Sequence, residues 1–404
     1  MKILVLNSGS SSQKSFLYEL GETLPPEAPE PLWAATIEWD GDSAEVRVRK
    51  SAGNVVCARA KISSRKAAIQ YLLSTLWSGK SRLVEKPTAI DVVGHRVVHG
   101  GPHFKHPVRV DAEVKNAIAG VSVFAPLHNR AELEGMEIVE QVLGPVPQVA
   151  VFDTGFHSQM PLYATVYPGP YEWFEQGIRR YGFHGINHEY VARRAAQMLG
   201  KPPDSLKLVS CHLGNGCSLA AIRDGHSIDT TMGFTPLEGL MMGTRCGSID
   251  PGVLTYLMRS THVTGEQLDD ILNKRSGLRG ISGTSSDMRE IQDEVARGNE
   301  LAQLAFDMFV HRLQSGIGSM AAVLGGMDAL IFTGGIGEHS AEVREKTCAS
   351  LGFVGVQLDG DKNAHPKLDT DVASASSRVR LLVIAAQEDW AIARECWKIE
   401  TASQ

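Results

Sequence analysis

A pattern of strand, small-residue turn and strand occurs at two distant places in the chain and limits the folds open to it. The first copy spans residues 3–20, with a polar turn at residues 7–12, and the second spans residues 208–222, with a turn at residues 214–216. Short apolar runs separated by glycine, serine or asparagine predict β-hairpins. Two hairpins of the same kind, far apart in the sequence, suggest two related domains.

Helices are expected between further strands. Apolar residues recur at helical spacing in four segments. Strands that alternate with helices predict an α/β protein, and a chain of 404 residues exceeds what one core usually holds. A proline-rich stretch, residues 24–31, is interpreted as a surface loop. The expected strands are residues 89–93, 96–98, 148–152 and 329–332, and the expected helices are residues 132–143, 189–199, 300–324 and 388–398.

Charge and cysteine content argue against several classes of protein. The formal net charge is −6, whereas a nucleic-acid-binding protein usually has a basic face. The six cysteines are scattered without a CxxC pair, so we expect neither a disulfide framework nor a zinc site, and a reducing compartment is the simpler interpretation. Residues 3–6 are too short for the apolar part of a signal peptide, and residues 320–332 are too short for a membrane span. We therefore expect a cytoplasmic protein that binds neither nucleic acid nor membranes.

Three glycine-rich turns follow apolar strands and could hold phosphate groups. They lie at residues 7–12, 214–216 and 334–337. Glycine lets backbone N–H groups approach an anion closely, although one such turn alone is more often only a tight turn. The Gly-Lys-Ser segment at residues 79–81 does not belong to a P-loop, because Ser74 occupies the position of the first glycine of that motif. A GxGxxG dinucleotide fingerprint is also excluded. Neither Gly214 with Gly216 nor Gly335 with Gly337 is followed by a third glycine at the required spacing.

Polar residues at strand ends could supply the other requirements of phosphoryl transfer, which are cations and a metal ion held by carboxylates. Arg96 and Arg245 lie in glycine-flanked, turn-like segments. Asp153 and Glu388 are candidate metal ligands, since magnesium is normally held by one or two carboxylates together with substrate phosphates. Structural roles stay open: a surface ion pair for either arginine, a turn-stabilising aspartate, and a glutamate favourable at a helix N-terminus.

Several histidines lie near these turns. His95 with His99, and His184 with His188, have the i,i+4 spacing that could bind zinc on a helix. Gly185 interrupts the second pair, and the first pair lies in a β-branched, strand-like stretch. For these side chains we therefore favour hydrogen bonding beside phosphate over metal ligation.

Set in order, these motifs resemble the acetate kinase family over essentially the whole chain. The resemblance implies an α/β, two-domain actin-like (ribonuclease H-like) fold of the acetate and sugar kinase, heat-shock chaperone and actin superfamily, with a nucleotide cleft between duplicated domains. It implies a first domain of residues 1–155, completed by a C-terminal helix at residues 388–404, and a nucleotide-binding second domain of residues 156–387. The matching segments are residues 7–14 (NSGSSSQK), 94–101 (GHRVVHGG), 126–129 (PLHN), 152–154 (FDT), 181–185 (YGFHG), 212–216 (HLGNG), 242–245 (MGTR), 287–289 (DMR) and 335–338 (GIGE).

The resemblance also implies roles for individual residues. Asp153 corresponds to a carboxylate described as a proton donor or acceptor, and His184 and Arg245 correspond to the groups that stabilise the transition state. Asn7 and Glu388 correspond to the magnesium-associated residues. The substrate-binding set is Arg96, for the carboxylate, with Val98, Leu127, Phe183 and Pro236 as the pocket for the methyl group. The nucleotide-binding set is Lys14, His212, Leu213, Gly214, Asn215, Gly216, Asp287, Met288, Arg289, Gly335, Ile336, Gly337, Glu338 and His339.

The implied reaction is reversible, direct in-line transfer of a phosphoryl group from ATP to acetate, giving acetyl phosphate and ADP. The implied metal is Mg²⁺, with Mn²⁺ as an alternative ion, and the implied assembly is a homodimer. A carboxylate is already ionised at pH 7 and needs little base catalysis, so we favour Asp153 as an electrostatic and metal-orienting group over a proton carrier. A propionate kinase of the same family is the alternative; Val98 favours the smaller acid, because relatives with larger substrates tend to have a smaller residue there.

Three positions depart from the family pattern, and two other functions stay open. Ser248 stands where aspartate is common, His339 where asparagine is usual, and Arg130 where proline is usual. A serine acyl-enzyme would use the SxxK motif of Ser11 and Lys14, but the companion SDN and KTG motifs are absent from the sequence. An inert actin-like nucleotide-binding module would explain the glycine turns but not the arginines and the histidine that the resemblance assigns to catalysis.

Overall fold

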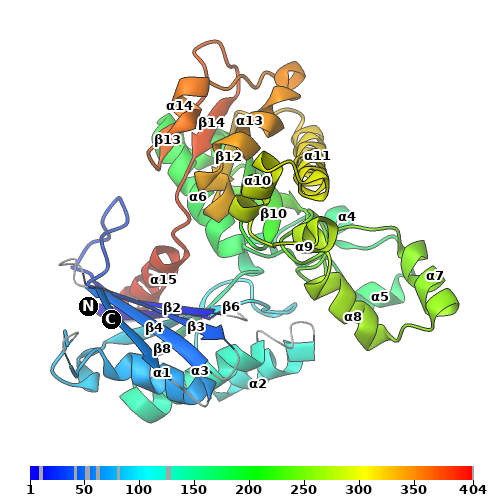
Figure 1. Ribbon diagram of the computed structural model, residues 1–404. Coiled ribbons are helices and arrows are strands. Elements are labelled where there is room, and N and C mark those ends of the chain that lie inside the picture. Colours follow the sequence, from blue (N-terminus) through cyan, green and yellow to red (C-terminus); the bar gives the residue numbers. More distant parts are fainter. Residues whose placement is uncertain are drawn as a thin grey trace. The chain divides into compact units, whose positions relative to one another are not determined.

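The computed structural model describes residues 1–8, 12–40, 43–50, 55–60, 64–79, 82–123 and 129–402, which form two compact units (Figure 1). The first unit contains Met1–Gly155 and Gln387–Gln404, and the second contains Phe156–Ala386. Each unit is built around one β-sheet with helices packed against it.

The first unit contains a mixed sheet with the strand order β5-β4-β3-β2-β1-β6-β8-β7. Neighbouring strands from β5 to β1 run antiparallel, whereas β1, β6 and β8 run parallel. The strands are β1 (Lys2–Ser8), β2 (Ser12–Glu19), β3 (Trp33–Asp40), β4 (Ser43–Lys50), β5 (Val55–Ala60), β6 (Val92–Val97), β7 (Val108–Arg109) and β8 (Gln148–Phe152). The helices are α1 (Arg65–Ser74), α2 (Ala112–Gly120), α3 (Asn129–Leu143) and α15 (Glu388–Ala402).

Helices cover both faces of this first sheet (Figure 1). On one face, Leu4 of β1 shares a buried cluster with Leu72 of α1 and Ile138 of α3. On the other face, α15 packs against β1 and β6, as the resemblance implies for the final helix. A Cβ on Gly94 of β6 would lie 2.6 Å from Cγ2 of Ile392 on α15. Glycine at this position therefore permits the close approach of α15 to the sheet.

The second unit contains a sheet with the strand order β11-β10-β9-β12-β14-β13. Among its described helices and those of the first unit, none is long and apolar enough to cross a membrane. The strands are β9 (Lys207–Leu213), β10 (Cys217–Arg223), β11 (His226–Thr230), β12 (Ala329–Thr333), β13 (Thr370–Asp371) and β14 (Arg380–Val383). The helices are α4 (Leu162–Thr165), α5 (Glu172–Glu175), α6 (Gly185–Leu199), α7 (Pro251–Thr261), α8 (Gly265–Lys274), α9 (Gly277–Ser282), α10 (Met288–Ala296), α11 (Glu300–Leu324), α12 (Gly334–His339), α13 (Ala341–Ala349) and α14 (Gly360–Ala364).

Helices α6 and α11 lie on opposite faces of the second sheet (Figure 1). Leu219 of β10 meets Gly316 of α11, where an added Cβ would lie 2.6 Å from Cδ1 of the leucine. The residue before it, Ser218, contacts His188 of α6 through a hydrogen bond. Successive side chains of a strand point to opposite faces. The face under α11 is therefore apolar at this point, whereas the face under α6 is polar.

Five strands in each sheet follow the same order and direction. The series β3-β2-β1-β6-β8 in the first unit corresponds to β11-β10-β9-β12-β14 in the second. In both series the first three strands are antiparallel, and the last two run parallel to the central strand. This order is that of a ribonuclease H-like, actin-like fold. The predicted fold class and both predicted hairpins are therefore confirmed.

Two local predictions differ from the structure. The sequence predicts two strands within residues 89–98, whereas β6 is one strand, Val92–Val97, preceded by a 3₁₀ turn at Pro87–Ala89. Gly94 lies within the continuous strand β6, and the reason for glycine there is the close packing of α15 and not a turn. Arg96 therefore lies on a strand and not in a turn. The turn predicted at residues 334–337 begins the short helix α12.

Candidate active site

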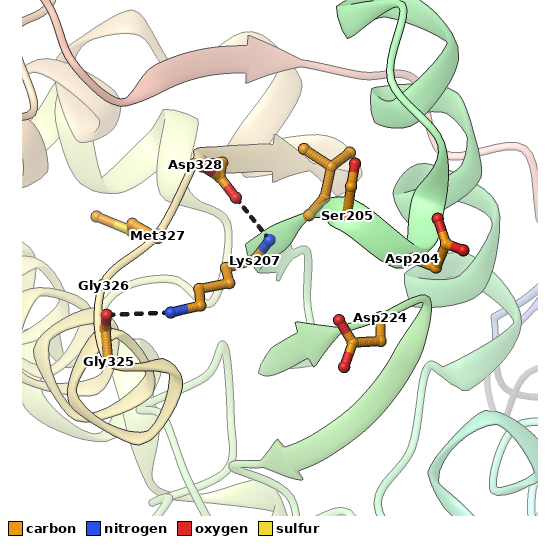
Figure 2. A pocket seen from close by; sticks show the side chains of 9 residues that line it. Asp204, Ser205, Lys207, Asp224, Gly325, Gly326, Met327 and Asp328 are labelled. Atoms are coloured by element: carbon orange, nitrogen blue, oxygen red, sulfur yellow. Dashed lines mark hydrogen bonds between the residues drawn. The ribbon is translucent and has the colours of Figure 1, made fainter.

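The cavity shown in Figure 2 lies at the opposite ends of the second unit's strands from the predicted site residues. It has a volume of about 450 Å³ and lies beside Lys207 and Asp328, where β9 and β12 begin. None of the predicted residues lines it. His212 and α12 lie at the carboxyl ends of the same two strands. This is the end at which open α/β sheets usually bind ligands.

Arg96 and Asp153 form a buried ion pair in the first unit. Arg96 lies near the carboxyl end of β6 and Asp153 directly follows β8, and because these strands are parallel neighbours, both side chains lie at one edge of the sheet. Arg96 Nη2 donates to Asp153 Oδ2 at 2.5 Å, and the two side chains are 13% and 1% exposed. The charge pair is therefore sheltered from water.

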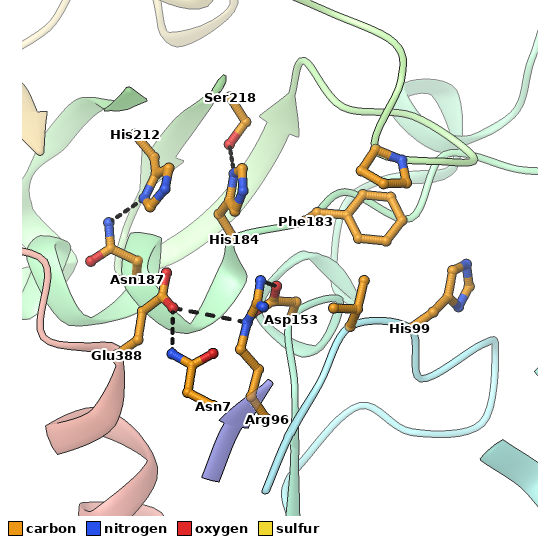
Figure 3. Close-up of polar contacts among 12 residues, drawn as sticks. Asn7, Arg96, His99, Asp153, Phe183, His184, Asn187, His212, Ser218 and Glu388 are labelled. Atoms are coloured by element: carbon orange, nitrogen blue, oxygen red, sulfur yellow. Dashed lines mark hydrogen bonds and ion pairs between the residues drawn. The ribbon is translucent and has the colours of Figure 1, made fainter. Parts of the chain in front are cut away.

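A second carboxylate, Glu388 at the start of α15, also contacts Arg96 (Figure 3). Its Oε2 lies 3.9 Å from Arg96 Nε and accepts a hydrogen bond from Asn7 Nδ2 at 3.1 Å. Burial alone would lower the pKa of Arg96, but the charges of Asp153 and Glu388 together raise it above its usual value. Arg96 is therefore a permanent cation that faces two carboxylates.

Asn7 and Glu388 also offer oxygen atoms of the kind that magnesium prefers, an amide carbonyl and a carboxylate. The hydrogen bond between them keeps both side chains together. Within the described ranges, no group of three or more histidine, cysteine, aspartate or glutamate side chains could hold a metal ion. The donor set fits a magnesium ion that takes its other ligands from phosphate and water.

Glu132 of α3 is a buried acid that the sequence does not single out. It is 2% exposed, and both its carboxyl oxygens lie 3.2 Å from the backbone nitrogen of Val98 and accept from it. Burial raises the pKa of Glu132 to about 8, against the opposing influence of Arg96 and of the Val98 N–H. The carboxyl is therefore mainly protonated at neutral pH, so Asp153 and Glu388 provide the negative charge beside Arg96.

Glu132→Gln is expected to remove part of the pH dependence of stability. Below the usual glutamate pKa both folded and unfolded chains carry the proton, whereas between that value and about 8 only the folded chain keeps it. The free energy of unfolding must then fall as pH rises, by about 2 kcal/mol between roughly pH 5.5 and pH 7. Urea unfolding of both proteins at these two pH values measures the slope. An equal slope in the variant would show that Glu132 is ionised in the fold.

The predicted methyl pocket has members in both units. Val98 follows β6 and is 5% exposed. Asn129 of α3 holds the next residue in place, because its side chain accepts from the N–H of His99 at 3.2 Å and donates to the carbonyl of His99 at 2.9 Å. Phe183 is 1% exposed and belongs, like Pro236, to the second unit, and Leu127 lies outside the described residues.

His184 precedes α6 in a backbone conformation that is unusual for a residue other than glycine. Its φ is 56°, in the left-handed region, which costs such a residue about 1–2 kcal/mol. Its Nδ1 lies 2.9 Å from Ser218 Oγ, and its ring stacks on that of His212, with centroids 4.1 Å apart (Figure 3). Asn187 Nδ2 contacts His212 Nδ1 at 2.8 Å. These contacts fix the orientation of both imidazole rings.

Arg245 lies beside His184 and the turn that follows β9. Its Nη1 donates to the carbonyl of Pro236 at 2.6 Å. A Cβ on Gly216 would lie 2.5 Å from Arg245 Nη2 and 3.4 Å from His184 Nε2. The absence of a side chain on Gly216 therefore leaves room for the guanidinium. A cation, an imidazole edge and a glycine-rich turn meet at this point.

Other members of the predicted nucleotide-binding set make mainly structural contacts. Asp287 caps α10 by accepting the backbone N–H of Arg289 at 2.9 Å. Glu338 Oε1 accepts the N–H groups of Gly334 and Ala386, both at 2.9 Å, and so links α12 to the segment after β14. Among the remaining members, Leu213, Gly337 and Met288 are buried, and Lys14, Asn215, Gly335 and His339 are exposed.

The structure gathers predicted residues into two groups, one in each unit. The first group is Asn7, Arg96, Asp153 and Glu388; the second is His184, His212, Gly216 and Arg245. Glu132, Asn187 and Ser218 hold these groups in place and were not predicted. One feature of the sequence could have identified Ser218, which is a polar residue within the otherwise apolar strand β10. It is paired in the sheet with His212 of β9, so both side chains point to the same face.

The chain is similar to known proteins over nearly its whole length. The model of the acetokinase family matches residues 2–394. The acetate kinase of Nostoc sp. is 56% identical over 402 residues, which is 99% of each chain. Among solved structures, the acetate kinase of Porphyromonas gingivalis gives a TM-score of 0.91 at 38% identity over 99% of both chains. A propionate kinase from Francisella tularensis gives 0.89 at 38% identity over 98% of both. The chain therefore belongs to the acetokinase family.

Proposed function

We propose that this chain transfers a phosphoryl group from ATP to acetate in a reversible reaction that gives acetyl phosphate and ADP. The observation that carries the proposal is the buried, permanently charged Arg96, with the buried apolar Val98 two residues further along the chain. A sheltered guanidinium is the group best suited to bind a small carboxylate. The 56% identity to the acetate kinase of Nostoc sp. over nearly the whole chain favours acetate as the acceptor.

The acceptor needs orientation more than activation. Acetate is ionised at neutral pH, so its oxygen can attack phosphorus without transfer of a proton. Arg96 would bind this carboxylate, and Asp153, paired with Arg96, would fix the guanidinium and orient the metal. Asp153 is already engaged by the guanidinium of Arg96, which supports an electrostatic role over proton transfer.

The phosphoryl group would be stabilised by the second group of residues. Direct in-line transfer places charge on the equatorial oxygens of the transferred group. Arg245 and His184 would donate hydrogen bonds to these oxygens, and the turn after β9 would offer its backbone to the nucleotide phosphates. The nucleotide contacts would come from Lys14, His212 to Gly216, Asp287 to Arg289, and Gly335 to His339.

Asn7 and Glu388 are the residues that we propose to hold Mg²⁺, with Mn²⁺ as an alternative ion. When bound, such an ion neutralises phosphate charge. The contribution of the chain is the fixed pair of oxygen donors and the arginine beside them, which balances the carboxylate charge.

We also propose a role for each unit, a cellular location and an assembly. Residues 1–155 with 388–404 would form the domain that binds the acceptor, and residues 156–387 the domain that binds the nucleotide. The enzyme would act in the cytoplasm as a homodimer. The structure describes Cys211, Cys217, Cys246, Cys348 and Cys396 as free thiols, which suits a reducing compartment.

A hydroxamate assay for acyl phosphate tests the proposed function. Purified protein with ATP and magnesium should form acyl phosphate from acetate faster than from propionate or butyrate, together with an equal amount of ADP. Propionate as the best substrate would support the alternative kinase. Release of ADP that does not depend on an added acid would contradict both. A covalent β-lactam adduct on a serine would support the acyl-enzyme alternative.

Val98→Ala is expected to shift preference toward propionate. Removing two methyl groups from this buried position, two residues after Arg96, leaves room for the extra methylene of propionate. The ratio of kcat/KM for propionate to that for acetate should rise by about tenfold. Leu143→Val, a buried truncation in the same unit, serves as the control for a change in stability alone. An unchanged ratio in Val98→Ala would contradict this position of the methyl pocket.

A further inference from the structure

A chain of hydrogen bonds continues from His184 into the core of the second unit. His184 Nδ1 lies 2.9 Å from Ser218 Oγ, and the same oxygen lies 2.8 Å from His188 Nε2. The other nitrogen of His188, Nδ1, lies 2.9 Å from Ser210 Oγ. Ser210, Ser218 and His188 are all fully buried. The series therefore runs from the half-buried His184 to a closed end at Ser210.

The protons of this series can be placed by counting donors. A neutral imidazole has one N–H and one acceptor nitrogen, and a serine hydroxyl has one hydrogen. His188 is neutral, because burial holds its pKa well below the usual value. In the first arrangement Ser210 donates to His188 Nδ1, His188 Nε2–H donates to Ser218, and Ser218 donates to His184 Nδ1. Every hydrogen between Ser210 and His184 Nδ1 then has an acceptor.

The reverse arrangement leaves one hydrogen without an acceptor. His184 Nδ1–H would donate to Ser218, Ser218 to His188 Nε2, and His188 Nδ1–H to Ser210. Within the described part of the chain, Ser210 Oγ has no hydrogen-bond partner besides His188. Its hydroxyl hydrogen would be buried and unsatisfied, which is strongly unfavourable. The closed end of the series therefore selects the first arrangement.

A positive charge on His184 is also disfavoured by its surroundings. The His212 ring stacks on it with centroids 4.1 Å apart and planes inclined by 19°. Arg245 is close as well, since its Nη2 and His184 Nε2 both approach the position of a Cβ on Gly216. A second cation next to a guanidinium would be repelled. The charge of Arg245 therefore favours a neutral imidazole, whereas the stacked His212 ring restricts the orientation of His184.

We propose that Ser210, His188 and Ser218 form a relay that fixes His184 as a neutral imidazole with its proton on Nε2, the nitrogen beside Gly216 and Arg245. His184 then acts in the reaction as a hydrogen-bond donor, and it neither carries a charge nor accepts a proton. Ser210, His188 and Ser218 are positioning residues, because they act through His184. The use of the Nε2–H on a phosphoryl oxygen rests on the proposed function, whereas the position of the proton does not.

Nitrogen NMR of the intact protein tests the position of the proton directly. In protein labelled with ¹⁵N-histidine, the two ring nitrogens of His184 give distinct signals for a protonated and an unprotonated nitrogen. The His184→Gln variant identifies these signals among those of the 14 histidines. We expect a protonated Nε2 and an unprotonated Nδ1 at pH 7. A protonated Nδ1, with or without a protonated Nε2, would overturn the proposal.

Variants of Ser218 test the consequence for activity. Ser218→Ala removes the donor to His184 Nδ1, so kcat should fall about tenfold with the KM for acetate and ATP nearly unchanged. Ser218→Thr keeps the hydroxyl and should restore most of the loss. Ser227→Ala is the matched control, because Ser227 is a fully buried serine of the same sheet that bonds His157 instead. A loss in Ser227→Ala equal to that in Ser218→Ala would indicate a structural effect and contradict the relay.

The two experiments separate the relay from the proposed function. If the enzyme uses no acetate but the NMR signals show Nε2–H, the function fails and the relay stands. If acetate is the best substrate and the signals show Nδ1–H, the relay fails and the function stands.

Discussion

Arg96→Lys is expected to lower kcat/KM for acetate by about 10²–10³-fold, the loss typical of removing one donor that the transition state needs. Lysine keeps the charge but cannot donate to Asp153 and lie beside Glu388 from one planar group. The acetate carboxylate would then lose both an oriented partner and its position relative to the phosphoryl group. Initial rates at varied acetate and saturating ATP measure the effect.

The control for this variant is Arg109→Lys. Arg109 lies on β7 of the same unit and makes a two-point contact with Glu400, at 3.1 and 2.8 Å, but is half exposed. Surface pairs of this kind contribute little, so kcat/KM should not change. If Arg96→Lys stayed within threefold of the unmodified enzyme while its melting temperature was normal, Arg96 would not be the carboxylate-binding residue.

The hairpins could be predicted because their signals are local. The turn at residues 214–216 joins two apolar strands and its pairing needs no distant contact, so β9 and β10 follow from the sequence directly. Gly94 was misread for the opposite reason. Its meaning depends on Ile392, almost 300 residues later in the chain, which approaches too closely for any side chain. A long-range packing reason for glycine has no local signature.

The same distinction separates the predicted site residues from the missed ones. Arg96, Asp153 and His184 lie in motifs with a recognisable order. Glu132 lies in an amphipathic helix, where a glutamate normally faces water, and its burial against Val98 becomes visible only in the fold. Ser218 reads as an ordinary small residue of a strand. Residues that hold functional groups in place are chosen by three-dimensional neighbours, so the sequence identifies them poorly.

Gly216→Ala is expected to lower kcat about 100-fold while the protein stays folded. The new Cβ would lie 2.5 Å from Arg245 Nη2, so the guanidinium must leave its position although its Nη1 is anchored on the carbonyl of Pro236 at 2.6 Å. One lost donor to the transition state corresponds to a reduction of about this size. The backbone at Gly216 is not in the left-handed region, so alanine fits its conformation and should not reduce the melting temperature.

A double-mutant cycle shows whether this loss acts through Arg245. Gly214→Ala is the steric comparison, because its Cβ would make only ordinary contacts of 3.5 Å or more, and it should cost much less activity. Arg245→Ala alone should be as impaired as Gly216→Ala or more. Adding Gly216→Ala to Arg245→Ala should then change kcat little, because the group that the new methyl displaces is already gone. Two losses that multiply would mean that Gly216 acts on the nucleotide phosphates directly and that the room it leaves for Arg245 is incidental.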